Sequence, residues 1–159
     1  NHFFTKSLEL CEQTENWNEM TSKEKLLNLH FTFFENLTMN RSLVLMILGE
    51  TKRKEWIILQ ELRKNFLEFT KQLTFENLEI LEKAKESIKN FNEKTREEAL
   101  WLHFISIIEF WKKDQSPSFE KTDLYIEKTI DTGFEFINNE PLKKVMDLGK
   151  FLWKEKFKV

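Results

Sequence analysis

Apolar residues recur every three or four positions along most of the chain, the pattern of helices with one buried face. In the first half this pattern predicts four helices, at residues 2–14, 22–37, 42–48 and 52–73. Thr21 and Glu24 have the spacing of a capping box at the start of the second helix, and Asn40 is placed to cap the third. The third segment is almost wholly apolar, so we expect it to be buried on nearly all sides.

The second half of the chain predicts four more helices, at residues 74–91, 95–113, 118–137 and 141–153. Thr95 and Glu98 form a second capping box, and Ser118 is placed to cap the helix that follows the break at Ser116-Pro117. We find no convincing strand and no linker long enough to separate two domains. The pattern therefore predicts an all-α bundle of about eight helices, forming a single domain over residues 1–159.

Composition excludes several other classes. Three Gly and two Pro are too few for a β-sandwich or for phosphate-binding loops, and one Cys excludes an internal disulfide and a Cys-based zinc cluster. The longest apolar run, Leu43–Leu48, is far shorter than the roughly 20 residues of a membrane span, and the sequence has no signal-peptide pattern. We therefore expect a cytoplasmic protein without membrane contact. The net charge of −2 gives no reason to expect direct nucleic-acid binding.

The three histidines, His2, His30 and His103, lack the spacing of a known metal or catalytic motif. A helical zinc protease has two His four residues apart, and a di-iron bundle has Glu-x-x-His pairs. We therefore predict no catalytic residue, no metal, no cofactor and no enzymatic activity. His30 and His103 lie among apolar helical neighbours, so each is either a hydrogen-bonded core residue or a polar anchor in a ligand cavity.

Aromatic residues are in excess, with 16 Phe and five Trp against one Tyr. One interpretation is a core packed with Phe. The other is that large rings leave gaps between helices, where bundles bind small apolar ligands. For such a pocket the sequence offers six candidates from the central helices: His30, Phe31, Phe34, Trp56, Phe66 and His103.

The segment Leu100–Trp111 is apolar on nearly every face, and the helix after it has two apolar sides. A chain of this size can cover only about half of a long helix, so a second layer is expected. Two such helices from each of two copies would form a four-helix bundle between residues 95 and 137. The predicted dimer contacts are Trp101, Phe104, Ile108, Ile126, Ile130 and Phe134. The alternative is burial within one chain.

Three stretches resemble the C-terminal regulatory domain of TetR-family transcriptional regulators. They are WKKDQSPSFEKTDLYIEK at residues 111–128, a tail with DLGKFL at 147–152 and KEKF at 154–157, and residues 22–35 with KEKLL and FTFF, together with Asn40-Arg41-Ser42. The resemblance implies a domain that binds an inducer and dimerises. In such proteins an N-terminal helix-turn-helix module reads a palindromic operator, and a ligand in the helical core shifts the spacing of the two modules.

We therefore expect a bacterial homodimer whose helical core senses a small apolar effector. The chain begins at Asn1 without a helix-turn-helix. DNA would accordingly be bound only through an N-terminal domain that is not in this chain. The alternative is a helical lipid- or quinone-binding protein with no DNA-related function, which would need a large cavity that opens at the surface.

Overall fold

The computed structural model describes residues 2–74 and 86–138, and in these ranges the chain is helical with no strand. The α-helices are α1 (His2–Glu12), α2 (Ser22–Met39), α3 (Arg41–Gly49), α4 (Lys52–Thr70), α5 (Glu86–Lys113) and α6 (Glu120–Asn138). The all-α class is confirmed. The count of eight is not, because the described ranges hold six α-helices and two 3-10 turns, and the helix predicted at residues 141–153 lies outside them.

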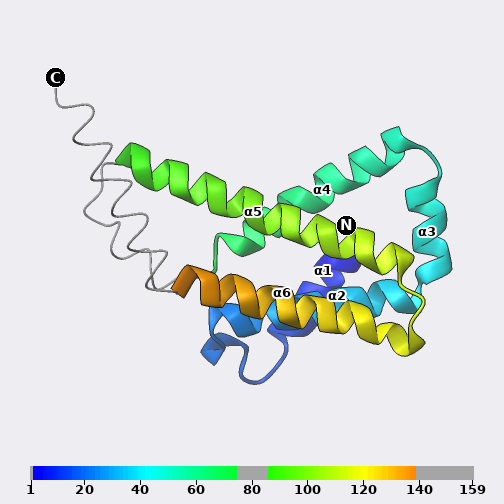
Figure 1. Ribbon diagram of the computed structural model, residues 1–159, viewed down its shortest axis with the longest axis horizontal. Coiled ribbons are helices and arrows are strands. Elements are labelled where there is room, and N and C mark those ends of the chain that lie inside the picture. Colours follow the sequence, from blue (N-terminus) through cyan, green and yellow to red (C-terminus); the bar gives the residue numbers. More distant parts are fainter. Residues whose placement is uncertain (1, 75–85, 139–159) are drawn as a thin grey trace.

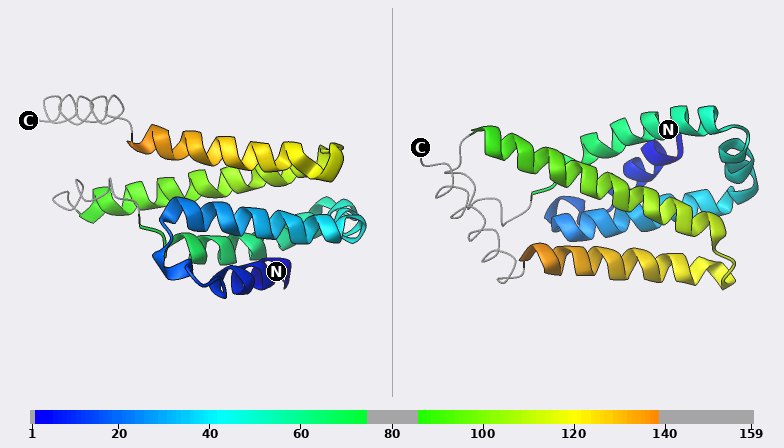
Figure 2. Two further views of the ribbon diagram at one scale, coloured as in Figure 1. Left: turned by 90° about the horizontal axis from the view of Figure 1, so that it is seen from below. Right: turned by 45° about the horizontal axis from the view of Figure 1, so that its top comes forward.

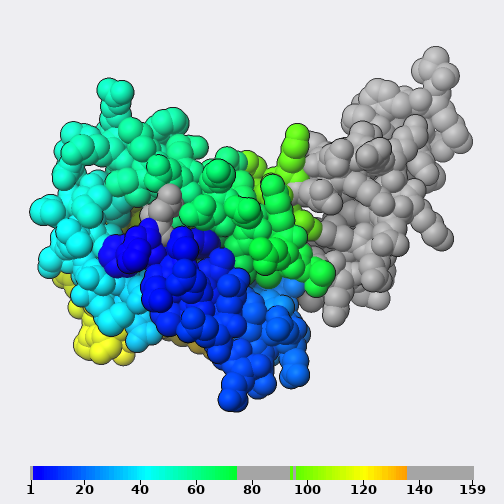
Figure 3. Space-filling view, turned by 180° about the vertical axis from the view of Figure 1, so that it is seen from behind, coloured from blue at the N-terminus to red at the C-terminus, as the bar shows by residue number. Residues whose placement is uncertain are grey.

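The helices are stacked in layers, with α6 on one outer side and α1 and α4 on the other (Figures 1 and 2). Helices α2 and α5 lie between these outer layers. α2 packs against both α1 and α6, while α5 packs against both α4 and α6. On the side of the molecule shown in Figure 3, α1 and α4 lie next to one another and are in contact. The two central helices are therefore the most thoroughly covered.

The start of α2 is the capping box that the sequence predicts. The Thr21 hydroxyl accepts from the Glu24 N–H at 3.3 Å, and the Glu24 carboxylate accepts from the Thr21 N–H at 2.7 Å. Asn40 does not cap α3, because its side-chain amide donates backwards to the Asn36 carbonyl at 3.0 Å. A cap that the sequence analysis missed is Thr51, whose hydroxyl accepts from the Lys54 N–H at the start of α4.

The predicted helix start at Thr95 is wrong. Helix α5 continues through this position from Glu86 to Lys113, a length of 28 residues. No Gly or Pro interrupts that stretch, and a Thr-x-x-Glu pair caps a helix only where the backbone at Thr is not helical. The pair therefore lies inside a longer helix.

The prediction that α3 is buried on nearly all sides is also wrong. Val44 is buried, but Leu43 and Met46 are 47% and 58% exposed. The short helix crosses the end of the bundle and packs mainly on α4, so only one of its faces meets the interior. Its opposite face stays uncovered in the single chain.

The corner between α5 and α6 is organised by Asp114. Its carboxylate accepts four hydrogen bonds of 2.7–2.9 Å, from the N–H and hydroxyl of Ser116 and the N–H and hydroxyl of Thr122. Burial opposes ionisation, but the hydrogen bonds outweigh it and lower the pKa of Asp114 to about 2. Ser118, predicted as the cap of α6, instead has a left-handed backbone with φ 51°. Asp114 and Ser116 perform the capping.

Arg41 ties the start of α3 to this corner. Its guanidinium donates to the carbonyls of Trp111, Lys112 and Asp114 at 2.7, 3.0 and 3.1 Å, at the C-terminal end of α5, where carbonyls lack the regular helical hydrogen bond. The same group lies 4.7 Å from the ring centres of both Trp111 and Phe119. One side chain therefore joins α3 to both sides of the α5–α6 corner.

Candidate functional site

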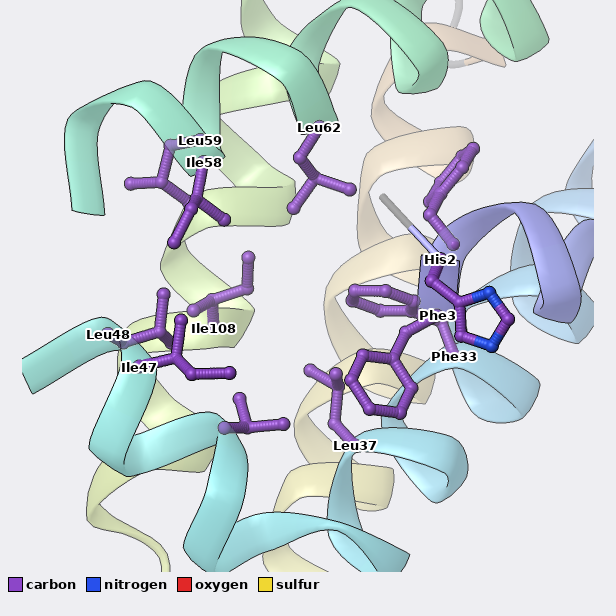
Figure 4. Close-up of a pocket in the computed structure, with 12 residues that line it drawn as sticks. His2, Phe3, Phe33, Leu37, Ile47, Leu48, Ile58, Leu59, Leu62 and Ile108 are labelled. Atoms are coloured by element: carbon purple, nitrogen blue, oxygen red, sulfur yellow. The ribbon is translucent and has the colours of Figure 1, made fainter. Parts of the chain in front are cut away.

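A cavity of about 240 Å³ lies between α1, α2, α3, α4 and α5. In Figure 4 the side chains of α3 and α4 face those of α1 and α2 across it. Its wall is formed by one histidine and eleven apolar side chains: His2, Phe3, Phe4, Phe33, Leu37, Val44, Ile47, Leu48, Ile58, Leu59, Leu62 and Ile108. The imidazole of His2 supplies the only side-chain nitrogens of this lining. The cavity is therefore suited to an uncharged apolar molecule.

The inner wall of the cavity is part of a cluster of aromatic rings centred on Phe104. Phe33 and Phe4, which line the cavity, lie 5.3 and 6.3 Å from the Phe104 ring centre. On its other sides Phe104 is stacked on Phe66 at 4.5 Å and touched by His30 at 5.1 Å. Phe33 therefore connects the wall of the cavity to Phe104 of α5.

His30 lies behind this aromatic layer and is fully buried. Its Nδ1 is 2.7 Å from the Leu26 carbonyl oxygen. A carbonyl can only accept, so Nδ1 carries the proton and Nε2 presents a lone pair. Nε2 has no hydrogen-bond partner.

His103, on α5, lies beside His30, with ring centres 5.8 Å apart. Its Nε2 is 2.7 Å from the Thr129 hydroxyl on α6. The Thr129 hydroxyl is also 2.6 Å from the Tyr125 carbonyl, to which it donates, so it accepts from His103. Nε2 of His103 therefore carries the proton, and its Nδ1 has the lone pair.

Both histidines are held in the neutral state. Burial, together with the neighbouring His103, lowers the pKa of His30 to about 3, against the opposing effect of the Leu26 hydrogen bond. Burial also lowers the pKa of His103. The pair thus presents two uncharged imidazoles at neutral pH, because desolvation disfavours the cationic form.

The outward face of α5 and α6 carries exposed apolar side chains. Leu102 and Leu124 are 66% and 48% exposed, and Phe110 is also exposed. The Phe110 ring is stacked on Tyr125 of α6 at 4.6 Å with an interplanar angle of 3°. Exposed apolar patches on soluble domains commonly mark contact surfaces.

None of the six residues predicted for a pocket lines this cavity. His30, Phe34 and Phe66 are buried in the core, Phe31 and His103 are half-buried, and Trp56 is 62% exposed on α4. The structure does bring His30, Phe66 and His103 together around Phe104. The cavity itself lies on the other side of the Phe33 and Phe4 rings.

The residues predicted for the dimer contact are largely in the chain's own core. Trp101, Phe104, Ile108, Ile126 and Ile130 are buried, and Phe134 is half-buried. The rings of α5 are covered by α1, α2 and α4, as the Phe4–Phe104 and Phe66–Trp101 contacts illustrate. A second copy is therefore not needed to cover these five side chains, contrary to the expectation from the sequence.

The sequence analysis missed the cavity residues of α3 because an almost wholly apolar segment does not show at once which of its sides is buried. The same run that suggested burial on all sides contains Val44, Ile47 and Leu48, which line the cavity, and Leu43 and Met46, which face away. The helical spacing of these two sets is the signal that could have separated them.

Within residues 2–74 and 86–138, the structure places no group of three or more His, Cys, Asp or Glu that could hold a metal ion. In the same described ranges, no helix has the length and apolar character needed to cross a bilayer. Cys11 is buried between α1 and α2, and burial raises the pKa of its thiol.

The sequence profile of one protein family matches residues 25–152, and its description is "Tetracyclin repressor-like, C-terminal domain". The match begins within the first turn of α2, takes in all of α3, α4, α5 and α6, and spans well over half of the chain. No curated protein and no solved structure gives a match to the chain.

Proposed function

The chain belongs to the family of tetracyclin repressor-like C-terminal domains, and from this we propose that it is the regulatory domain of a TetR-like transcriptional regulator. Domains of this family are not enzymes. In the proposal, the domain binds a small apolar effector and forms a homodimer, which would set the spacing of the DNA-binding modules joined to its two copies.

The cavity between α1 and α5 is the observation that carries the effector half of this proposal. Its wall is apolar except for His2, so the main attraction for a ligand would be removal of apolar surface from water. No charged side chain lines it, which disfavours an ionised effector because a buried charge needs a partner.

The size of the cavity favours a regulator over the lipid or quinone carrier that the sequence left open. At about 240 Å³, it is smaller than the roughly 300–1,000 Å³ of sites for drug-sized ligands. A long isoprenoid or diacyl chain would not fit. A molecule with a single ring or a short aliphatic chain would.

The exposed face of α5 and α6 supports the proposed homodimer. Leu102 and Phe110 on α5 and Leu124 on α6 are exposed apolar residues on adjacent helices, as the seam of a four-helix bundle with a second copy would require. This face differs from the set predicted from the sequence, since most of that set points into the chain's own core.

Helix α5 would connect effector binding to dimerisation, because it contributes side chains both to the cavity and to the exposed α5–α6 face. Ile108 lines the cavity, while Leu102 and Phe110 lie on the exposed face. A ligand that fits the cavity better in one position of α5 than in another would shift the population of dimer geometries. The shift is limited by the ligand's difference in affinity for the two positions.

Toluene, an uncharged single ring, is a direct probe of the cavity. A ligand that binds only the folded state raises Tm by mass action, so toluene at millimolar concentration is expected to raise Tm of the unmodified chain. Ile47→Phe fills the cavity and should abolish the shift. Leu45→Phe places the same ring on the same helix outside the lining and should retain it. An equal shift in both variants, or none in the unmodified chain, would reject the cavity as a site.

The dimer is tested by sedimentation equilibrium at micromolar concentration. Leu102→Glu is expected to convert the dimer to a folded monomer, because a charge would be buried at the seam. Leu10→Glu on α1 is the matched control, since Leu10 is also an exposed leucine and lies away from α5 and α6. A monomeric unmodified chain would refute the homodimer and leave the family assignment intact.

A further inference from the structure

The His30–His103 pair is separate from the cavity and has no part in the proposed function. Neither residue lines the cavity. The pair lies where α2, α5 and α6 meet, since His30 is on α2, His103 on α5 and their neighbour Thr129 on α6. His103 is half-buried, so the pair is not completely sealed from solvent.

The hydrogen bonds of the two rings leave each ring with one nitrogen that can only accept. His30 donates from Nδ1 to the Leu26 carbonyl, and His103 donates from Nε2 to the Thr129 hydroxyl. The remaining nitrogen of each ring is a lone pair, and that of His30 is buried without a partner. The lone pair of His30 Nε2 can be satisfied only by a hydrogen-bond donor or another electron-pair acceptor, and the His103 ring beside it carries a second lone pair.

The hydrogen bonds that His30 and His103 donate to Leu26 and Thr129 are of the kind that metal-binding histidines make. A histidine that ligates a metal usually donates its other ring N–H to a carbonyl or a similar acceptor, which fixes the tautomer and orients the ring. His30 and His103 both satisfy this condition without a metal. Each is held in the neutral form that metal binding requires.

The number and charge of the ligands narrow the class of ion. The described residues bring no third His, Cys, Asp or Glu to the pair, whereas zinc in structural sites is almost always four-coordinate. Two neutral ligands also leave the whole charge of the ion uncompensated, and this cost is far larger for a divalent than for a monovalent cation. Linear coordination by two nitrogens is characteristic of monovalent d¹⁰ ions.

We propose that His30 and His103 form a two-coordinate binding site for a monovalent d¹⁰ metal ion, copper(I) being the biological representative. Imidazole is a suitable ligand for copper. The edge-on rings of Phe66 and Phe104 pack against His30, with ring centres 6.1 and 5.1 Å from its own.

The separation of the rings fits such an ion. Metal–imidazole bonds of about 2.0–2.1 Å would place the two ring centres no more than roughly 6.4 Å apart in a linear arrangement and closer in a bent one. The observed 5.8 Å lies within this limit. The spacing of α2 and α5 at this pair is therefore compatible with one ion shared by the two rings.

Silver(I) is the probe, because it shares this coordination preference and is stable in air. Cys11 is the only cysteine in the chain and would compete for silver, so every variant carries Cys11→Ala. Binding is measured by titration calorimetry. Long-range ¹H–¹⁵N spectra of the imidazoles then report which ring nitrogens are bound and separate this site from the methionines.

We expect one equivalent of silver(I) to bind and to shift one nitrogen in each of two histidines. His30→Phe keeps a ring of similar size in the core, and His103→Gln changes a half-buried position, so both should fold. Each should weaken binding more than a hundredfold. Thr129→Val removes only the outer hydrogen bond and should weaken it about 10–100-fold.

His2→Gln is the matched control, since His2 is the third histidine of the chain and lies outside the pair. It should leave binding unchanged. The proposal is overturned if silver(I) fails to bind, if binding survives in His30→Phe, or if it is lost in His2→Gln. It is also overturned if zinc binds to the pair more tightly than silver(I).

Discussion

Asp114 makes the stability of the α5–α6 corner depend on pH in a way that can be calculated. Its carboxylate accepts four hydrogen bonds, and their effect exceeds that of burial, so its pKa falls from 3.8 to about 2. One unit of pKa corresponds to about 1.4 kcal/mol between the two protonation states. The ionised carboxylate therefore contributes about 2 kcal/mol to the free energy of unfolding at pH 7.

The direction of the pH dependence follows from the lowered pKa. Above 3.8 the carboxylate is ionised in both the folded and the unfolded chain, and the full contribution is present. Between 3.8 and about 2 the unfolded chain takes up a proton before the folded chain does, so stability is lost as the pH falls. Below about 2 both states are protonated and the contribution is gone.

Asp114→Asn is the perturbation that tests this calculation. The amide keeps the shape of the side chain but turns one acceptor into a donor that faces the N–H groups of Ser116 and Thr122. We expect a loss of about 2 kcal/mol at pH 7 in urea unfolding, shrinking as the pH approaches 2. Glu127→Gln, an exposed carboxylate on α6, should change stability by less than about 0.5 kcal/mol. A loss at Asp114 that stays constant with pH would refute the reasoning.

Three further changes test the packing around this corner and the aromatic cluster. Arg41→Ala should cost about 2–4 kcal/mol in urea unfolding, because charge-assisted hydrogen bonds and two ring contacts are lost together, whereas exposed Arg53→Ala should cost less than about 0.5. Phe104→Ala should cost about 3–5 kcal/mol by leaving a cavity among the rings, measured as a lower urea midpoint. Thr38→Val should cost about 1–3 kcal/mol in the same assay, because it removes the 2.9 Å acceptor of the buried Trp111 indole N–H.

Local sequence patterns predict the helices of this fold well, but they predict the contacts between the helices poorly. The periodicity of α2 and α4 and the Thr21 capping box depend on residues within a few positions of one another, so a sequence reports them directly. The α5–α6 corner is joined to α3 by Arg41, which reaches carbonyls some 70 residues away in the sequence. Contacts of that range depend on how the helices pack, which periodicity does not specify.

The candidate sites were harder to predict for the same reason. The sequence marks His30, Phe66 and His103 as unusual, and the structure brings them together, yet the cavity is formed by other residues. A helix with apolar residues on many faces can be covered by neighbours of its own chain, as Trp101 and Ile130 are. Which neighbour covers which face is a property of three-dimensional packing.

Whether a position on α5 or α6 is buried in the single chain therefore decides what a charged substitution there can reveal about the dimer. Ile130, one of the contacts that the sequence predicted for the dimer, is only 2% exposed in the single chain. A carboxylate there would be buried without a partner in the folded monomer itself, so loss of the dimer would follow from unfolding and would not report on the interface. Leu102 is exposed in the single chain, and a charge there remains hydrated unless a second copy covers it. A selective loss of association in Leu102→Glu, with unchanged urea unfolding of the monomer, would therefore locate the dimer seam where Ile130→Glu cannot.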